Sequence, residues 1–273
     1  MMKTNLIIGA SYNYSYEQIR YWINSINKSG FDGHKVLILF DGTTELVEKV
    51  QEQGFVVNNI PMDKNMAVHV LRFLSIYDFI HQNEDLYENV ITTDVRDVVF
   101  QYDPVEWLNN NFSDMEKLVV SSECLRYKDE PWGNNNLLET YGPFIHERFK
   151  DNIIFNVGIL AGKASYIKDL CLSIVLNSIN RPIKICDQAV FNVTIQNEIY
   201  KQNTFYAKLN DAWAANLGTL ADQSKMHYFR PNLLELEPVF VNDEVRTSNN
   251  KKICVVHQYD RTPWRTRLEE IYG

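Results

Sequence analysis

Short aliphatic runs alternate with amphipathic segments over the first third of this 273-residue chain. The run Val36–Phe40 is continuously apolar, as in a strand that is buried on both faces of a sheet. The segments between such runs repeat their apolar residues with the helical period. Strands are expected at 6–8, 36–40, 55–57 and 90–93, and helices at 16–29, 44–53 and 66–79. This alternation predicts an α/β fold with a doubly wound, mostly parallel sheet and helices on both faces.

The second half of the chain is less regular. Strands are expected at 118–120, 153–161 and 254–256, and helices at 166–176 and from Asp187 onward. The stretch Glu123–Pro143 is rich in polar and aromatic residues and contains two glycines and two prolines. We expect it to be a long loop, and long loops often carry function.

Two carboxylates follow the fourth expected strand, where the buried chain returns to the surface. Asp94 and Asp97 flank Arg96, and carboxylate oxygens in a fixed array suit a hard divalent cation. An isolated D-x-x-D is more often a helix cap with a surface ion pair. His257 also follows an expected strand, and mixed oxygen and nitrogen ligands suit Mn²⁺ better than Ca²⁺. We therefore expect these three residues to hold Mn²⁺, or Mg²⁺, if both strands end at one edge of the sheet.

Composition excludes several other classes of protein. The net charge of −8 disfavours nucleic-acid binding, which needs clustered Lys and Arg. The four cysteines show no C-x-x-C spacing, so neither a zinc site nor a disulfide scaffold is expected. No apolar run approaches the roughly 18 residues of a membrane span. We expect a cytoplasmic protein without a transmembrane segment.

The order of the motifs resembles that of a known family. The chain carries D-x-x-D, then F-N-V-G-I-L from Phe155, D-Q-x-x-x-N from Asp187 and V-H-Q-Y-D-R-T-P-W from Val256. This order is similar to nucleotide-sugar transferases of the GT-A fold, and most of all to retaining family-8 enzymes of the glycogenin, galactinol synthase and lipopolysaccharide galactosyltransferase type. The resemblance implies a single domain over 1–273, with a nucleotide-binding half (1–104) and a sugar and acceptor half (105–273).

The resemblance also implies roles for individual residues. Asp94, Asp97 and His257 would hold the metal against the diphosphate of a UDP-sugar donor. Asn156, Asp187 and Gln188 would be the catalytic residues that orient the sugar. The donor contacts would be Ala10, Tyr12, Asn13, Arg72, Arg96, Gly158 and Arg261. The acceptor stays open as a glycan, a lipid-linked glycan or a small molecule.

Two other functions stay open beside this one. A nucleotidyltransferase would share the sheet and the metal carboxylates, but it usually has a Gly-rich basic loop after the first strand, which Gly9–Asn13 lacks. A non-catalytic sugar-nucleotide binder is compatible with Val95, Ala189 and Thr262, where this chain departs from the family motifs.

The C-terminal tail has two interpretations. Its basic and aromatic residues could contact an anionic lipid surface. We favour a tail that closes the donor pocket, because the positive charges are few. The residues concerned are Arg261, Trp264, Arg265, Arg267 and Tyr272.

Overall fold

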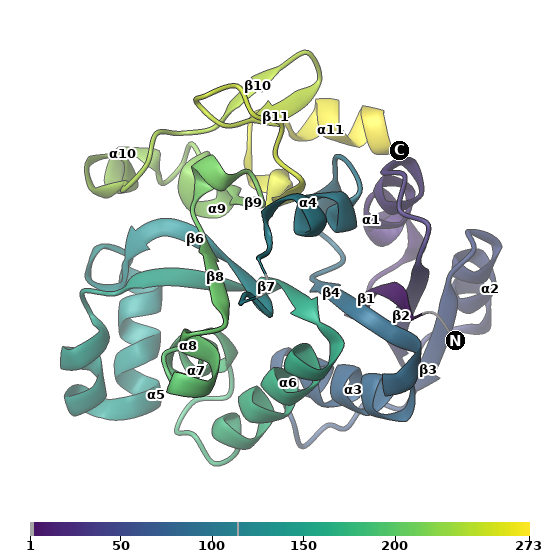
Figure 1. Cartoon of the computed structure of the whole chain (residues 1–273), viewed down its shortest axis with the longest axis horizontal. Coiled ribbons are helices and arrows are strands. Elements are labelled where there is room, and N and C mark those ends of the chain that lie inside the picture. The colour runs from purple at the N-terminus through teal and green to yellow at the C-terminus, as the bar shows by residue number, and fades with distance from the viewer. Residues whose placement is uncertain (1–2, 114) are drawn as a thin grey trace.

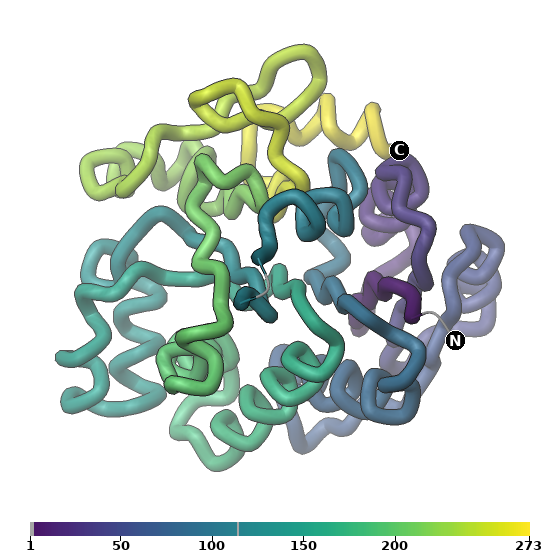
Figure 2. The backbone as a smooth tube through the Cα atoms, viewed as in Figure 1, coloured from purple at the N-terminus to yellow at the C-terminus, as the bar shows by residue number. Residues whose placement is uncertain are grey.

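The computed structural model describes residues 3–113 and 115–273, so positions 1, 2 and 114 of the expected domain lie outside the described residues (Figures 1 and 2). A seven-stranded sheet has the order β3-β2-β1-β4-β7-β6-β8. The bounds are β1 Thr4–Tyr12, β2 His34–Phe40, β3 Val56–Ile60, β4 Tyr87–Thr93, β6 Leu118–Arg126, β7 Ile153–Lys163 and β8 Thr204–Ala207. In this sheet β7 runs antiparallel to its neighbours β4 and β6, and the other described strand pairs are parallel. The mostly parallel α/β fold is therefore confirmed.

Helices cover both faces of this sheet (Figure 1). The longer ones are α1 Tyr16–Lys28, α2 Thr44–Glu52, α3 Val68–Gln82, α4 Pro104–Asn111, α5 Pro131–Phe149, α6 Ala164–Ser178, α7 Asp187–Thr194 and α11 Arg265–Tyr272. Short helical turns are α8 Glu198–Lys201, α9 Leu217–Leu220, α10 Met226–Phe229, η1 Glu84–Leu86, η2 Tyr127–Asp129, η3 Leu209–Asp211, η4 Arg230–Asn232 and η5 Tyr259–Arg261.

The two sides of the core follow from the period of the strands. Leu6 and Ile8 of β1 pack in one hydrophobic cluster with α3, α6 and α7, whereas Ile7 packs in a second cluster with α1, α2 and α4. Successive side chains of a strand point to opposite faces, so a continuously apolar strand serves both clusters. Trp22 of α1 also donates its indole N–H to Thr93 Oγ1 at 2.8 Å. This bond fixes α1 against the end of β4, next to the acidic residues.

A second sheet of three strands brings the chain's distant parts together. It has the order β5-β12-β9, with bounds Val98–Phe100, Val255–His257 and Ala214–Asn216. Its register places His257 opposite Val98, directly after Asp97. The main-chain N–H of Gln258 donates to the main-chain carbonyl of Asp97 at 2.7 Å. This sheet therefore delivers the histidine to the end of β4. A separate hairpin joins β10 (Val239–Val241) and β11 (Glu244–Arg246).

The expectation of a long loop over Glu123–Pro143 is wrong. Strand β6 continues to Arg126, and α5 begins at Pro131. Glu130 caps this helix, because its carboxylate accepts the main-chain N–H groups of Trp132 and Gly133. Pro at the first helical position costs nothing, since that N–H has no helical partner. Gly142, with φ 74°, interrupts the helix at a kink, and a second helical segment that contains the second proline follows it to Phe149.

No helix in the described ranges has the length and apolarity that crossing a membrane requires.

Candidate active site

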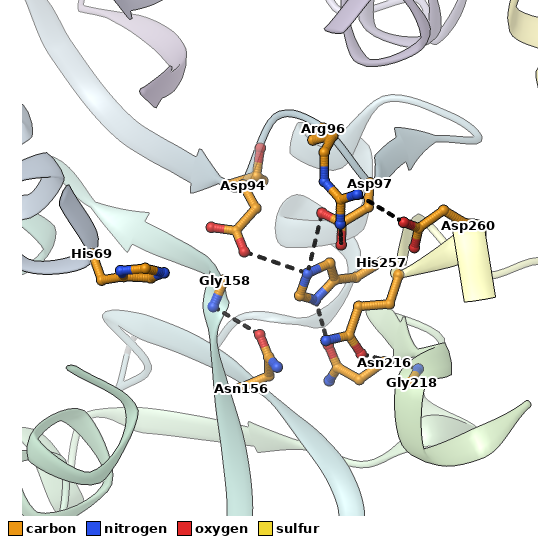
Figure 3. Close-up of polar contacts among 12 residues, drawn as sticks. His69, Asp94, Arg96, Asp97, Asn156, Gly158, Asn216, Gly218, His257 and Asp260 are labelled. Carbon is orange, nitrogen blue, oxygen red and sulfur yellow. Dashed lines mark hydrogen bonds and ion pairs between the residues drawn. The ribbon is translucent and has the colours of Figure 1, made fainter. Parts of the chain in front are cut away.

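The two aspartates and the histidine of the predicted metal site converge. Ligand atoms of Asp94, Asp97 and His257 all lie within 4.8 Å of one another. His257 Nε2 is 3.5 Å from Asp94 Oδ2 and 3.7 Å from Asp97 Oδ1 (Figure 3). Asp94 and Asp97 stand between β4 and β5, and His257 ends β12, so the second sheet causes this meeting.

Each aspartate divides its two oxygens between an arginine and the histidine. Asp94 Oδ1 pairs with Arg72 Nη1, and Oδ2 faces the imidazole. Asp97 Oδ2 pairs with Arg96 Nη2 at 3.3 Å, and Oδ1 faces the imidazole. Arg96 also reaches Asp260 Oδ2 at 3.1 Å. The arginines thus orient the carboxylates, and one oxygen of each is left for a third partner.

The imidazole of His257 is held in one tautomer. Asn216 Oδ1 lies 3.1 Å from His257 Nδ1, and the Asn216 amide nitrogen donates to the Ser122 carbonyl at 3.0 Å. Asn216 Oδ1 is therefore an acceptor for Nδ1–H, which leaves the lone pair of Nε2 toward the aspartates. Burial lowers the pKa of His257, and nearby Arg261 lowers it further, while Asp97 opposes both. A neutral imidazole and two carboxylate oxygens form a donor set for a divalent cation.

Gly158 makes room for this donor set. A Cβ added at Gly158 would lie 2.7 Å from Asp94 Oδ2 and 2.8 Å from His257 Cε1. The Asp94 amide donates to the Gly158 carbonyl at 2.8 Å, so this position of β7 also fixes the start of the D-x-x-D segment. The absence of a side chain is a spatial requirement here.

The predicted sugar-orienting residues line one large cavity of about 440 Å³. Asn156, Asp187 and Gln188 share its wall with Gly158 and His257. Asn156 Oδ1 accepts the Gly158 amide at 2.7 Å, and Asp187 Oδ2 pairs with Arg72 Nη2 at 3.1 Å. Arg72 therefore bridges Asp187 and Asp94, which links the sugar-orienting group to the metal group.

The last residue of the D-Q-x-x-x-N motif has a structural part. Asn192 accepts the Phe155 amide at 2.9 Å and donates to the Phe155 carbonyl at 2.8 Å. This pair of bonds clamps α7 onto β7 and so places Asp187 and Gln188 beside Asn156.

Most predicted donor contacts line a second cavity of about 230 Å³ at the end of β1. The predicted residues on its wall are Ala10, Tyr12, Arg72, Asp94, Arg96, Asp97, His257 and Arg261. Asn13 lines a different hollow, together with Asp41. Arg261 approaches Gly218 closely, because a Cβ at Gly218 would meet Arg261 Nη1 at 2.8 Å.

The three residues at which this chain departs from the family motifs are all buried. Val95 and Ala189 are buried in hydrophobic clusters. Thr262 is buried, and its hydroxyl donates to the Tyr259 carbonyl at 2.9 Å.

The tail arginines have acidic partners within the chain. Arg265 pairs with Glu269, and Arg267 pairs with Asp243 and Glu270. Trp264 stacks on Phe240. Closure of the donor pocket by this tail stays our prediction, with membrane contact as its alternative.

Several residues on the cavity walls were not among the predicted site residues. They are His69, Glu123, Glu130, Trp132, Gly218, Lys225 and Gln258. His69 lies one helical turn before Arg72, so the i, i+3 spacing was a usable signal. Glu123 and Trp132 fall in the stretch that we expected to be a loop.

Comparisons with known proteins agree at the level of the fold. No protein-family model matches the sequence, and a search of curated proteins gives no match. The structure is similar to the glycosyltransferase GlyE of Streptococcus pneumoniae TIGR4, with a TM-score of 0.59 and 14% sequence identity. The match covers 99% of this chain and 59% of that one, so this chain spans just over half of its length. The fold is thus GT-A-like, but 341 solved chains match it, and the reaction has to be argued from the site.

Proposed function

We propose that this protein is a metal-dependent glycosyltransferase that moves a sugar from a nucleotide-diphosphate donor, preferably UDP-linked, to an acceptor. The observation that carries the proposal is the convergence of Asp94, Asp97 and His257 within 4.8 Å at the sheet edge of a GT-A-like fold. Retention of anomeric configuration is part of the proposal and rests on the family-8 resemblance. A single domain over residues 1–273 is also proposed, since both halves contribute strands to one sheet.

The metal-binding part of the proposal rests on the donor set. Asp94, Asp97 and His257 would hold Mn²⁺ or Mg²⁺, and the missing side chain of Gly158 avoids a clash with Asp94 and His257. When bound, the ion supplies Lewis-acid stabilisation for charge on the leaving diphosphate.

The remaining steps fall to the chain's own residues. Arg72 and Arg261 supply positive charge on the walls of both cavities and would bind the diphosphate, with Arg96 beside them. Ala10, Tyr12 and Asn13 would contact the base and ribose. Asn156, Asp187 and Gln188 would orient the sugar, so that its anomeric carbon faces the acceptor hydroxyl.

The cellular location is a proposal as well. All four cysteines are free and buried, which supports a reducing compartment such as the cytoplasm.

The test is hydrolysis and transfer with a panel of UDP-, GDP- and ADP-sugars, with Mn²⁺ and with EDTA. We expect Mn²⁺-dependent release of UDP, and NMR of the product should show the retained anomer. If no donor is turned over or bound, the transferase proposal fails. Consumption of UTP and sugar 1-phosphate would favour a nucleotidyltransferase. Calorimetric donor binding without turnover on any acceptor would favour a sugar-nucleotide binder.

A further inference from the structure

The large cavity has lining side chains that the donor chemistry above does not use. They are Glu123 at the end of β6, Glu130 and Trp132 at the start of α5, and Lys225 before α10. In Figure 1, α5 lies toward the β6–β8 edge of the sheet, whereas β1, at whose end the predicted nucleotide contacts lie, is toward the other edge. The cavity therefore extends from the metal residues toward a second group of side chains.

A bulge-like irregularity in β6 surrounds Glu123, which lines the cavity. The pairing of β6 with β7 shifts register between Ser122 and Arg126, and Cys124 has a left-handed φ of 59°. Bulges re-aim side chains and are common next to active sites. A non-glycine residue in this conformation is uncommon, so the surrounding structure must hold it.

Glu123 contacts the residues that would orient the sugar. Its side chain is buried, and Oε1 accepts the Asn156 amide at 2.7 Å. The nearby side chain of Gln188 acts to lower the pKa of this carboxyl group. A carboxylate offers about four lone-pair sites, so Glu123 can accept a further hydroxyl group.

Trp132 has an unusual exposure for a tryptophan of this protein. It is 55% exposed although it lines the cavity, whereas Trp22, Trp107 and Trp213 are buried. Its main-chain N–H is held by Glu130 Oε1 at 3.3 Å, which fixes the position of the residue at the helix start. An exposed aromatic ring on the wall of a polar cavity suits a ligand that has one apolar face and one polar edge.

We propose that Trp132 and Glu123 form the acceptor subsite, and that the acceptor is a neutral, hydroxyl-bearing sugar ring. The apolar face of the ring lies on the indole, and one hydroxyl donates to the Glu123 carboxyl group. The carboxyl groups of Glu123 and Glu130 disfavour a phosphate or carboxylate on the acceptor at this wall, and the exposed Lys225 offers a donor to ring oxygens. This inference rests on the proposed transferase function.

The transfer itself balances without a further reactant. The bond from the anomeric carbon to the diphosphate oxygen breaks, and the diphosphate leaves with the electron pair. A bond from the anomeric carbon to the acceptor oxygen forms, and the acceptor proton passes to the departing diphosphate oxygen.

The test compares Trp132→Ala and Trp132→Phe with the matched control Phe144→Ala. Phe144 lies in the part of α5 after the Gly142 kink and is 73% exposed, but it is not part of the lining of this cavity. Acceptors are methyl hexosides and methyl disaccharides, with glycerol and a Tyr-containing peptide as non-ring hydroxyl donors. For the best methyl glycoside we expect W132A to lower kcat/KM about tenfold or more, mainly through KM, because the apolar contact is lost. W132F should recover most of this loss, and F144A should match the wild type.

Donor hydrolysis without acceptor separates the two proposals. We expect this rate, the UDP affinity and the Tm of F144A to match the wild type, and we expect W132A to lose a much larger factor in acceptor-dependent transfer than in donor hydrolysis. A W132A variant with an unchanged acceptor KM would overturn the subsite and leave the transferase intact. Wild-type hydrolysis with transfer to glycerol or peptide but to no methyl glycoside would overturn it too. A wild type that neither hydrolyses nor binds any donor would remove the transferase function, and the subsite with it.

Discussion

The metal end of the site (Asp94, Asp97 and His257) and the acceptor end of the large cavity (Glu123 and Trp132) differ in how firmly their side chains are held. At the metal end, each side chain has a charged or buried polar partner: Arg72 for Asp94, Arg96 for Asp97 and Asn216 for His257. At the acceptor end, Glu123 is buried, but Trp132 is fixed through its main chain and exposes its ring. Preorganised polar groups serve chemistry, whereas an exposed ring serves recognition. Changes at the metal end should therefore reduce turnover, and changes at the acceptor end should alter acceptor choice.

The largest effect is expected from the metal ligands. Asp97→Asn keeps the shape of the side chain but removes the charge that faces His257. Mn²⁺-dependent turnover of the donor should fall about 10³-fold, as for the loss of a main electrostatic contribution to catalysis. Steady-state assays over a range of Mn²⁺ concentrations measure this. Asp85→Asn, at an exposed aspartate before β4, is the control and should be unaffected. Full Mn²⁺-dependent activity in D97N would rule out Asp97 as a ligand.

The next effect is expected at Gly158. In Gly158→Ala, the new methyl group would meet Asp94 Oδ2 and the His257 ring at less than their normal contact distance. We expect Mn²⁺ affinity and turnover to drop about 100-fold, because small misplacements of catalytic groups cost this much. Calorimetric titration with Mn²⁺ measures the first quantity.

Gly142→Ala provides the matched control for the glycine change. Nothing lies within 4 Å of an added Cβ there, but φ is 74°, so only backbone strain is introduced. G142A should lose about 1 kcal/mol of stability and keep its Mn²⁺ affinity. Equal losses of Mn²⁺ affinity in both variants would contradict the steric role of Gly158.

The two ends of the cavity also differ in what the sequence could predict. The metal ligands stand directly after apolar strands, and strand ends meet at sheet edges, so local patterns sufficed to nominate them. The mostly parallel sheet followed from the same alternation. The small sheet that places His257 next to Asp97 depends on the pairing of β12 with β5, and these two strands are far apart in the chain. No local pattern carries that pairing.

The acceptor end was missed because tertiary contacts override its local sequence. Asparagines, glycines and prolines between 131 and 143 indicate a loop, yet the Glu130 cap begins a helix, and Gly142 divides it into two helical segments. Glu123 stands in the bulge-like irregularity of β6 beside Cys124, a buried residue in a conformation that its type rarely takes. Neither feature has a sequence signature, because each depends on the neighbours that the fold supplies.

A smaller effect is expected from the group that orients His257. Asn216→Ala removes the acceptor for Nδ1–H, so the imidazole can turn or change tautomer. Loss of such a partner typically costs 10- to about 100-fold in metal affinity, and we expect a value near the lower limit because β12 still fixes the main chain. Calorimetry with Mn²⁺ measures this.

Asn89→Ala is the control for the asparagine change. Asn89 is also buried and lies in the first half of β4, away from the metal residues. Its side chain donates a hydrogen bond to Asn5 of β1. N89A should lose stability and keep its Mn²⁺ affinity. If N216A binds Mn²⁺ as tightly as the wild type, the imidazole does not need this hydrogen bond.

The smallest effect concerns stability at the acceptor end. Burial raises the pKa of Glu123, and the hydrogen bond from Asn156 only partly opposes this. Between the unfolded and the folded pKa the native state binds more protons, so wild-type stability falls as the pH rises through that window. Glu123→Gln has the same shape and no titration. The free energy of unfolding of E123Q minus that of wild type should therefore rise by on the order of 1 kcal/mol from acidic to alkaline pH.

Urea unfolding of the metal-free proteins at pH 5 and pH 9 measures this gain, and the exposed Glu139→Gln serves as the control. If the difference in the free energy of unfolding between E123Q and wild type does not change with pH, the Glu123 carboxyl group is in contact with water in solution. The metal end would then be the only desolvated end of the cavity. Acceptor recognition would depend on the Trp132 ring alone, and E123Q should then leave the acceptor KM unchanged while W132A still raises it.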